Sequence, residues 1–212
     1  MADLEWARQS LLKHLEYEIA DNRVVEAMKR VPREAFVSQE QYQAAYDDRP
    51  LSIGFEQTIS QPFIVALMVQ ALELRGDEKV LELGTGSGYE AAILAELAQK
   101  VVTVECIPEL AKSARQVLDK LGYSNIEVHV AGKTLGWPDE APYDAIIVSA
   151  GAPTVPEVLL EQLTCNGRLV IPVGSRLQQE LLRVTRLKKR NQIENLGGCY
   201  FVPLIGEGAW EK

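Results

Sequence analysis

The chain has 212 residues, of which 47% are hydrophobic and 25% are charged, a balance typical of a soluble globular protein that can bury a full core. Its 30 acidic residues outnumber the 22 lysines and arginines, and the formal net charge is −8. This acidity argues against nonspecific binding to nucleic acid or anionic membranes, because both need a surplus of positive charge on one face. We therefore expect neither a nucleic-acid nor a membrane partner.

Three further features suggest a cytoplasmic protein. The longest apolar run, at 63–69, is far too short to cross a bilayer, and the amino terminus lacks the apolar core of a signal peptide. Neither a CxxC pair nor a histidine cluster predicts a metal site. The cysteines are odd in number and widely scattered, which fits reduced thiols (Cys106, Cys165 and Cys199).

The amino-terminal third is predicted to form a helical cap followed by a loop. Apolar residues recur at near-helical spacing from Leu4 to Met28, as far as the turn at Val31-Pro32. Residues 45–63 are polar, irregular and rich in turn formers, so they predict a long functional loop. Pro62 suits the first turn of a helix that continues through FIVALMVQALEL.

From Lys79 onward, short apolar strands alternate with helices, which predicts a parallel, doubly wound α/β sheet with helices on both faces. After Gly174, LLRVTRL and the stretch around CYFVPLI, separated by KKRNQ, predict an antiparallel hairpin. The basic run Arg186 to Arg190 is predicted to be its solvated turn. We expect one domain over residues 1–212, divided into a cap with substrate loop (1–60), a cofactor-binding core (61–174) and the hairpin (175–212). The predicted strands are 79–83, 101–105, 126–130, 143–150 and 167–174, and the predicted helices are 90–98, 108–122 and 156–163.

The triplet Gly132-Lys133-Thr134 looks like the end of a phosphate-binding loop. That pattern requires a further glycine five positions earlier, where its backbone would approach the phosphate. The residue at that position is Glu127, whose carboxylate would repel phosphate. The triplet therefore does not predict a nucleotide-triphosphate site.

A glycine turn, GTGSG, follows the first strand of the sheet, at the edge where open parallel sheets bind ligands. A dinucleotide fingerprint would need a glycine at Tyr89. Glu105, at the end of the next strand, could accept hydrogen bonds from a ribose diol, which both NAD and S-adenosylmethionine carry. Glu82 would oppose a pyrophosphate but favour a sulfonium or ammonium cation, so it tips the choice toward S-adenosylmethionine. A tight turn without a ligand is the alternative.

Gln57, Thr58 and Ser60 cluster just before a helix amino terminus, where hydroxyls and free N–H groups could bind a carboxylate. The alternative is that Ser60 only caps the helix.

Six blocks together resemble the protein-L-isoaspartate O-methyltransferase family, from about residue 20 to the carboxyl end: VPREAFV (31–37), IGFEQTISQP (53–62), VLELGTGSGYEAA (80–92), LGWPDEAPYDAIIVSAGAP (135–153), GRLVIPVG (167–174) and FVPLIG (201–206). The resemblance implies a Rossmann-like class I methyltransferase fold that uses S-adenosylmethionine and yields S-adenosylhomocysteine. The implied substrates are proteins or peptides with L-isoaspartyl and, in some members, D-aspartyl residues. Methylation of the free carboxylate starts their repair through a succinimide.

The resemblance also implies roles for particular residues. Ser60 is expected to be the catalytic-site hydroxyl, and Gln57, Thr58 and Ile59 to line the pocket around cofactor and substrate. Glu105 is expected at the ribose, and we expect the enzyme to be a monomer. The glycine turn would border the methionine part of the cofactor, and Glu82 is expected to bind the cofactor beside it. The turn consists of Gly84, Thr85, Gly86, Ser87 and Gly88.

The sequence departs from the family at two places. Members carry Gly-Asp-Gly where this chain has Ala131, Gly132 and Lys133, and that aspartate resembles an adenine-binding residue. Backbone groups of Gly132 and Lys133 could replace it. The Lys133 side chain is expected to face solvent, or alternatively to pair with Glu105 or Asp139.

The second departure is Glu56, which stands where many members carry glycine; it could alter the loop, although an exposed glutamate is the simpler reading. The departures leave two other functions open. One is an O-methyltransferase acting on a different peptide or a small acid, and the other is a binding module with impaired cofactor binding. A nucleic-acid methyltransferase is disfavoured by the net acidity and by the lack of an NPPY-like motif for a flipped base.

Overall fold

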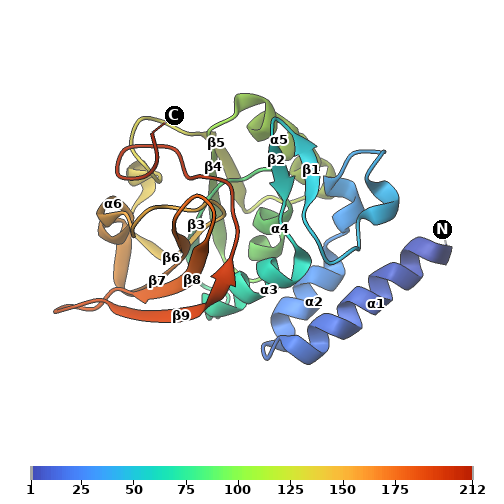
Figure 1. Cartoon of the computed structure of the whole chain (residues 1–212), viewed down its shortest axis with the longest axis horizontal. Helices are drawn as coiled ribbons and strands as arrows, with labels where there is room; N and C mark the ends of the chain where they lie inside the picture. The colour runs from blue at the N-terminus through green and yellow to red at the C-terminus, as the bar shows by residue number, and fades with distance from the viewer. Residues whose placement is uncertain (1, 212) are drawn as a thin grey trace.

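Two helices form the predicted amino-terminal cap in the computed structural model, which describes residues 2–211 (Figure 1). Helix α1 spans Ala2–Glu18 and α2 spans Asn22–Arg30. The Asp21 side chain accepts a hydrogen bond from the Arg23 N–H at 3.0 Å and so caps α2. The apolar face of α2 is buried, so the cap packs on the rest of the chain rather than standing apart (Val24, Val25, Ala27 and Met28).

The segment predicted to be a long loop contains ordered structure. Short 3₁₀ helices, η1 (Arg33–Phe36) and η2 (Tyr42–Ala44), precede an antiparallel hairpin of β1 (Leu51–Gly54) and β2 (Gln57–Ile59). Phe55 and Glu56 turn the hairpin, with φ values of 52° and 58°. These left-handed conformations usually require glycine or asparagine, so the turn carried no sequence signal that would have predicted it.

Seven strands form one mixed sheet in the order β5-β4-β3-β6-β7-β8-β9. The first five are parallel, whereas β8 and β9 add antiparallel to β7, which confirms the predicted sheet and terminal hairpin. Strand order reverses at β3, so the carboxyl ends of β3, β4 and β6 border the crevice where such sheets bind ligands. The strand bounds are β3 (Lys79–Leu83), β4 (Lys100–Glu105), β5 (Ile126–Val130), β6 (Tyr143–Val148), β7 (Leu163–Gly174), β8 (Gln179–Thr185) and β9 (Gln192–Cys199).

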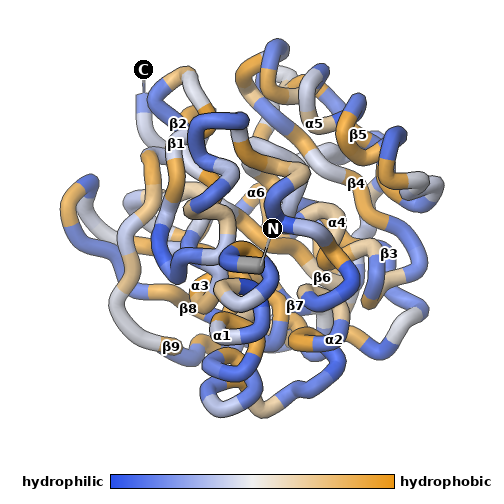
Figure 2. Tube along the Cα trace, turned by 90° about the vertical axis from the view of Figure 1, so that its right-hand side faces the viewer, coloured by the Kyte–Doolittle hydropathy of each residue, from blue (hydrophilic) through white to orange (hydrophobic). Residues whose placement is uncertain are grey.

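Helices cover both faces of the sheet, with α6 on the side away from α3 and α4 (Figure 1). Side chains of β3 alternate between two apolar cores: Val80 faces the core shared with α1 to α5, while Leu81 and Leu83 face the core shared with α6. In Figure 2 the central strands are largely orange and the outer turns largely blue. The remaining helices are α3 (Pro62–Ala71), α4 (Tyr89–Ala95), α5 (Pro108–Leu121), η3 (Pro138–Glu140) and α6 (Glu157–Glu161).

The carboxyl-terminal segment corrects one detail of the predicted hairpin. Its second strand is Gln192–Cys199, not the stretch around CYFVPLI. Residues 201–206 instead run beside Gly151, whose N–H donates to the Val202 carbonyl at 2.8 Å and whose carbonyl accepts from the Leu204 N–H at 2.8 Å. This pairing brings the end of the chain to the carboxyl ends of the central strands.

None of the helices within residues 2–211 combines the length and the apolarity that crossing a bilayer requires.

Candidate active site

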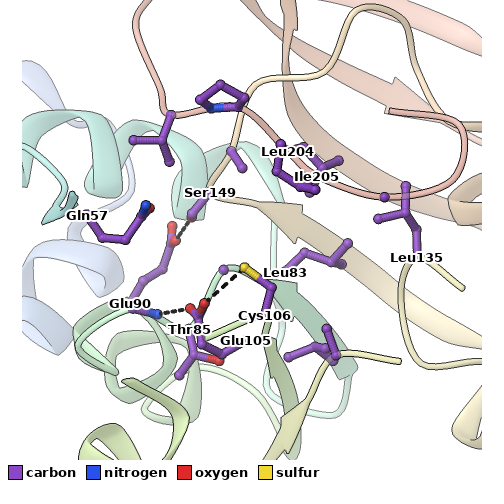
Figure 3. Close-up of a pocket in the computed structure, with 18 of the residues that line it drawn as sticks. Gln57, Leu83, Thr85, Glu90, Glu105, Cys106, Leu135, Ser149, Leu204 and Ile205 are labelled. Carbon is purple, nitrogen blue, oxygen red and sulfur yellow. Dashed lines mark hydrogen bonds between the residues drawn. The ribbon is translucent and has the colours of Figure 1, made fainter. Parts of the chain in front are cut away.

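One cavity opens at the carboxyl ends of β3, β4 and β6, and segments distant in the sequence meet around it (Figure 3). The hairpin end contributes residues 57–60 and the glycine turn contributes residues 84–87. Residues 104–106, 131–136, 149–150 and 202–206 also line it, together with Val65, Leu83, Tyr89 and Glu90. The cavity therefore joins the predicted cofactor elements to the predicted substrate segment.

The glycine turn is held against the end of β4 by backbone and side-chain hydrogen bonds. The Gly84 N–H donates to the Val104 carbonyl at 2.8 Å, and its φ of 94° is one that glycine adopts without strain. The Gly86 N–H donates to Glu105 Oε2 at 2.8 Å, and the Ile107 N–H donates to Oε1 at 3.0 Å. These bonds fix the Glu105 carboxylate at the cavity edge, where the predicted ribose contact stays a prediction.

Gly88 and Glu82 lie outside the cavity lining. Gly88 has a φ of 90°, and a Cβ there would lie 3.3 Å from Ala114 and Leu118 of α5. Its lack of a side chain therefore lets the start of α4 approach α5. Glu82 is fully buried on the β3 face that also carries Val80, beneath α4.

Ser60 lines the cavity with Gln57, Thr58 and Ile59, and their contact with cofactor and substrate stays a prediction. Ser60 does not cap α3, because the N-cap position is Gln61. Asp48 serves that helix end instead: its Oδ1 accepts from the Phe63 N–H and its Oδ2 from the Gln61 amide, both at 2.9 Å. The capping alternative for Ser60 is thus wrong, and its side chain is available for another role.

Arg33 holds the Ser60 segment in place, a role that the sequence did not predict. It is fully buried, and its guanidinium donates to the Ala45 carbonyl at 2.8 Å and to the Ser60 carbonyl at 2.8 Å. The guanidinium carbon also lies 4.7 Å from the centroid of the Tyr89 ring in α4. One cation therefore ties η1, the hairpin end and α4 together.

Gly132 and Lys133 line the other side of the cavity, just after β5. The Ala131 N–H donates to the Glu105 carbonyl at 2.7 Å, which positions this segment beside the glycine turn. Lys133 is exposed, and within residues 2–211 it makes no ion pair with Glu105 or Asp139. The solvent-facing alternative is the one observed.

Glu90 is a cavity residue that the sequence did not single out, because only its tertiary surroundings distinguish it from an ordinary helix acid. It is buried, and its Oε2 accepts a hydrogen bond from the Ser149 hydroxyl at the end of β6 (Figure 3). Burial raises the pKa of Glu90 to about 7, while the Ser149 hydroxyl acts in the opposite direction.

Glu82 lies close enough to Glu90 to feel its charge. Burial and, after it, the Glu90 charge raise the pKa of Glu82 well above its usual value. The nearby Thr103 side chain opposes this shift in pKa. Its hydroxyl hydrogen-bonds that of Thr85 at 2.6 Å, however, and within residues 2–211 neither oxygen of Glu82 has a hydrogen-bond partner. Glu90, which lines the cavity, and Glu82, which lies behind it, are therefore two carboxyl groups that resist ionising together.

An apolar wall faces these polar groups. Figure 3 shows Leu135, Leu204 and Ile205 gathered on one side of the cavity, with Gln57 and Glu90 on the other. The FVPLIG block carried the family resemblance but predicted no site residue, since nothing local in it indicates that the chain returns to the sheet.

A separate group of possible metal ligands lies at β5, outside the cavity. Single ligand atoms of Glu127, His129 and Glu140 lie within 4.8 Å of one another. The Lys100 ammonium already bonds Glu127 at 2.8 Å and Glu140 at 2.5 Å, and the His129 ring stacks on Trp137 with centroids 4.1 Å apart. The lysine supplies the positive charge that these carboxylates need.

Comparisons with known proteins agree with this geometry. The family model described as protein-L-isoaspartate(D-aspartate) O-methyltransferase matches residues 7–209. The chain is 58% identical over 193 residues to protein-L-isoaspartate O-methyltransferase 1 of Syntrophobacter fumaroxidans, covering 91% of this chain and 90% of that protein. It is 50% identical over 208 residues to the enzyme of that name from Dictyoglomus turgidum, covering 98% and 94%.

Solved structures extend the comparison to the fold. A protein-L-isoaspartate O-methyltransferase superposes with a TM-score of 0.84 at 28% identity, over 95% of this chain and 67% of its own. A Plasmodium falciparum protein described by the same activity, solved with S-adenosyl-L-homocysteine, superposes with a TM-score of 0.76 at 26% identity, over 92% and 96%. The predicted class I methyltransferase fold is confirmed, and the chain belongs to the protein-L-isoaspartate (D-aspartate) O-methyltransferase family.

Proposed function

We propose that this protein transfers the methyl group of S-adenosylmethionine to the free carboxylate of L-isoaspartyl residues in damaged proteins and peptides. The observation that carries the proposal is the single cavity in which the Ser60 segment meets the glycine turn and Glu105, in a chain of this family. The methyl ester then closes to a succinimide when the following backbone nitrogen displaces methanol. Hydrolysis of the succinimide converts a fraction of these residues to normal aspartate.

The residues around the cavity fit an S-adenosylmethionine cofactor. Gly86 and Ser87 offer backbone without bulky side chains, and the buried Glu105 carboxylate keeps lone pairs for a ribose diol. Glu90 Oε1 is buried with no hydrogen-bond partner within residues 2–211, so a cation in the cavity would satisfy it. Apolar Leu135 and Leu204 provide a surface against which an adenine could pack. When bound, the cofactor supplies an electrophilic methyl group on a sulfonium sulfur.

The reaction needs little acid–base chemistry from the chain. A substrate carboxylate is already ionised at pH 7, so its oxygen can form the new bond to the methyl carbon while the carbon–sulfur bond breaks. The electron pair of that bond stays on sulfur. Alignment and exclusion of water are the main tasks of the site, and alignment alone can lower a barrier by about 7 kcal/mol. We propose that the Ser60 hydroxyl donates a hydrogen bond that orients the carboxylate.

A paired peptide assay tests this proposal. An L-isoaspartyl peptide and its L-aspartyl counterpart are incubated with the protein and methyl-labelled S-adenosylmethionine. Label is expected in the isoaspartyl peptide only, and equal labelling of both would exclude the repair function. A D-aspartyl peptide in the same assay defines whether that substrate class is accepted.

The same assay, combined with calorimetry, separates the two other functions left open by the sequence. Measurable cofactor binding together with methylation of a different carboxylate would indicate an O-methyltransferase of other specificity. No measurable binding of S-adenosylmethionine would instead indicate a binding module.

We further propose that residues 1–212 act as one methyltransferase domain and as a monomer in the cytoplasm, with no nucleic-acid or membrane partner. The continuous seven-stranded sheet supports the first point, and the net charge of −8 supports the last. Analytical ultracentrifugation at micromolar concentration tests the monomer, since a mass of twice 23.5 kDa would contradict it.

A further inference from the structure

Two buried carboxyl groups, Glu90 in the cavity lining and Glu82 behind it, have oxygens that are largely unpartnered. Glu82 is 0% exposed and Glu90 is 7% exposed. Both oxygens of Glu82 and Oε1 of Glu90 lack a hydrogen-bond partner within residues 2–211, while Ser149 satisfies Oε2 of Glu90. A buried polar atom without a partner is costly, so a proton or a bound cation at these oxygens would stabilise the protein.

Among residues 2–211, no positive charge compensates the pair. The charged groups that act on Glu82 are two further acids, Glu90 of α4 and Glu105 of β4. Within residues 2–211 no lysine or arginine forms an ion pair with Glu82 or Glu90. The nearby Arg33 instead bonds two backbone carbonyls and faces the Tyr89 ring. Two adjacent carboxyls without a cation cannot both ionise, and they titrate as a unit.

We infer that Glu82 and Glu90 form an acid pair that retains a proton while the cavity is empty and releases it when a sulfonium cation enters. The inference rests on S-adenosylmethionine being the ligand, as proposed above. Glu90 lines the cavity, so its unpartnered oxygen is available to that cation, whereas Glu82 lies behind it. The pair thereby distinguishes the charged cofactor from its neutral-sulfur product.

The proton balance follows from this arrangement. On binding, one carboxyl O–H bond breaks, the proton passes to the solvent buffer, and the carboxylate that remains balances the sulfonium charge. After methyl transfer the sulfur is neutral, so the pair takes a proton back from solvent. S-adenosylhomocysteine carries the same amino and carboxylate groups but no sulfonium, and it therefore displaces fewer protons.

The pair also makes cofactor affinity depend on pH in a defined direction. The ionised form binds the cation, and burial raises the pKa of Glu90 to about 7. Affinity for S-adenosylmethionine is therefore expected to rise with pH below that value, by up to about tenfold per unit, and to level off above it. Affinity for S-adenosylhomocysteine should change much less over the same range.

Isothermal titration calorimetry tests the inference on the unmodified protein. At pH 6.0, each ligand is titrated in buffers that differ in ionisation enthalpy, and the slope gives the protons released. The amino groups of both ligands are protonated at this pH. A release approaching one proton is expected for S-adenosylmethionine and a clearly smaller one for S-adenosylhomocysteine. Equal releases would overturn the acid pair.

Two variants test whether Glu90 is the source of the released proton. Glu90→Gln keeps an oxygen that can accept from Ser149 but cannot ionise, so the difference between the two ligands should disappear. Glu127→Gln removes a half-exposed acid outside the cavity and should leave the difference unchanged. If Glu90→Gln does not fold, the comparison of the two ligands on the unmodified protein still tests the acid pair. Failure of S-adenosylmethionine to bind would refute the proposed function, whereas binding with equal proton release would refute the acid pair alone.

Discussion

Ser60 contributes to the site through two different atoms. Its carbonyl accepts a hydrogen bond from Arg33 at 2.8 Å, which anchors the segment. Its hydroxyl makes no hydrogen bond within residues 2–211, although the residue lines the cavity. A substitution that removes only the hydroxyl therefore separates the structural role from the functional one.

Ser60→Ala is expected to preserve folding and cofactor affinity but to lower methyl transfer to an isoaspartyl peptide. A hydrogen bond to a charged group contributes about 1.5 to 3 kcal/mol, which corresponds to a loss of about 10- to 100-fold in kcat/KM. Steady-state kinetics and calorimetry measure the two quantities. Ser52→Ala, an exposed serine in the same hairpin, serves as the matched control. Unchanged turnover in Ser60→Ala would contradict its assigned role.

Gly132 stands where the family carries an aspartate, and its surroundings leave room for one. A Cβ at this position would meet no atom within 4 Å, and the backbone φ is not in the left-handed region. Gly132→Asp is therefore expected to fold normally. It should tighten S-adenosylmethionine binding several-fold, because a typical hydrogen bond contributes about 0.5 to 1.5 kcal/mol.

Calorimetric titration of Gly132→Asp measures this gain. Gly198→Asp on β9 is the matched control, since it adds the same charge in open space outside the cavity lining. An equal effect in both variants would indicate a general influence of charge. No change in either would mean that backbone groups already hold the adenine side of the cofactor.

At the scale of elements, the position of the Ser60 segment depends on Arg33. Arg33→Lys keeps the charge but replaces a planar fork by a single ammonium, which cannot bond the Ala45 and Ser60 carbonyls in the same way. We expect the free energy of unfolding to fall by about 2 to 4 kcal/mol, because a buried carbonyl and a buried cation lose partners. Catalytic efficiency should fall as well, since the hairpin end is no longer fixed.

Urea unfolding and peptide kinetics test this prediction together. Arg49→Lys is the control in the same region: its ion pair with Asp47 is about half exposed on both sides, so stability should change by less than about 0.5 kcal/mol. Lost stability with normal kinetics in Arg33→Lys would show that the anchor serves the fold alone.

The strands of the sheet were predictable because their burial makes them short continuous apolar runs. Predicted bounds match those of β3 and β5, and the other parallel strands differ only at their ends. The β1–β2 hairpin was not predictable. Its strands have four and three residues, and Phe55 and Glu56 occupy its left-handed turn without the usual glycine or asparagine. Glu56 is exposed there, which agrees with the simpler of the two interpretations given for this residue.

At the scale of the whole molecule, topology explains which site residues the sequence could indicate. Glycines and acids at strand ends indicate a ligand edge, because parallel strands bring their carboxyl ends together. Arg33 and the segment 202–206 reach the site only through tertiary packing, and Glu90 stands in the helix after the glycine turn; no local pattern marks any of them. Glu82 shows the reverse: its local position suggested a cavity residue, whereas the pleat directs it beneath α4.

The cavity joins segments from the hairpin, the glycine turn and the chain end, so a ligand that fills it should stabilise the whole molecule. S-adenosylhomocysteine at 100 times its Kd is expected to add about 2.7 kcal/mol, which raises Tm by about 5 to 10 °C for a chain of this size. Differential scanning calorimetry measures the shift. Adenosine at the same concentration lacks the methionine part and should give a clearly smaller one.

Hydrogen exchange locates the effect of that ligand. Slower exchange is expected at residues 57–60, 84–87 and 202–206, because these segments border the cavity, while α1 should change only through the gain in global stability. A raised Tm without added protection in those three segments would place the ligand elsewhere on the molecule. Protection that includes residues 202–206 would instead establish that the end of the chain, which pairs with Gly151, closes one side of the cofactor site.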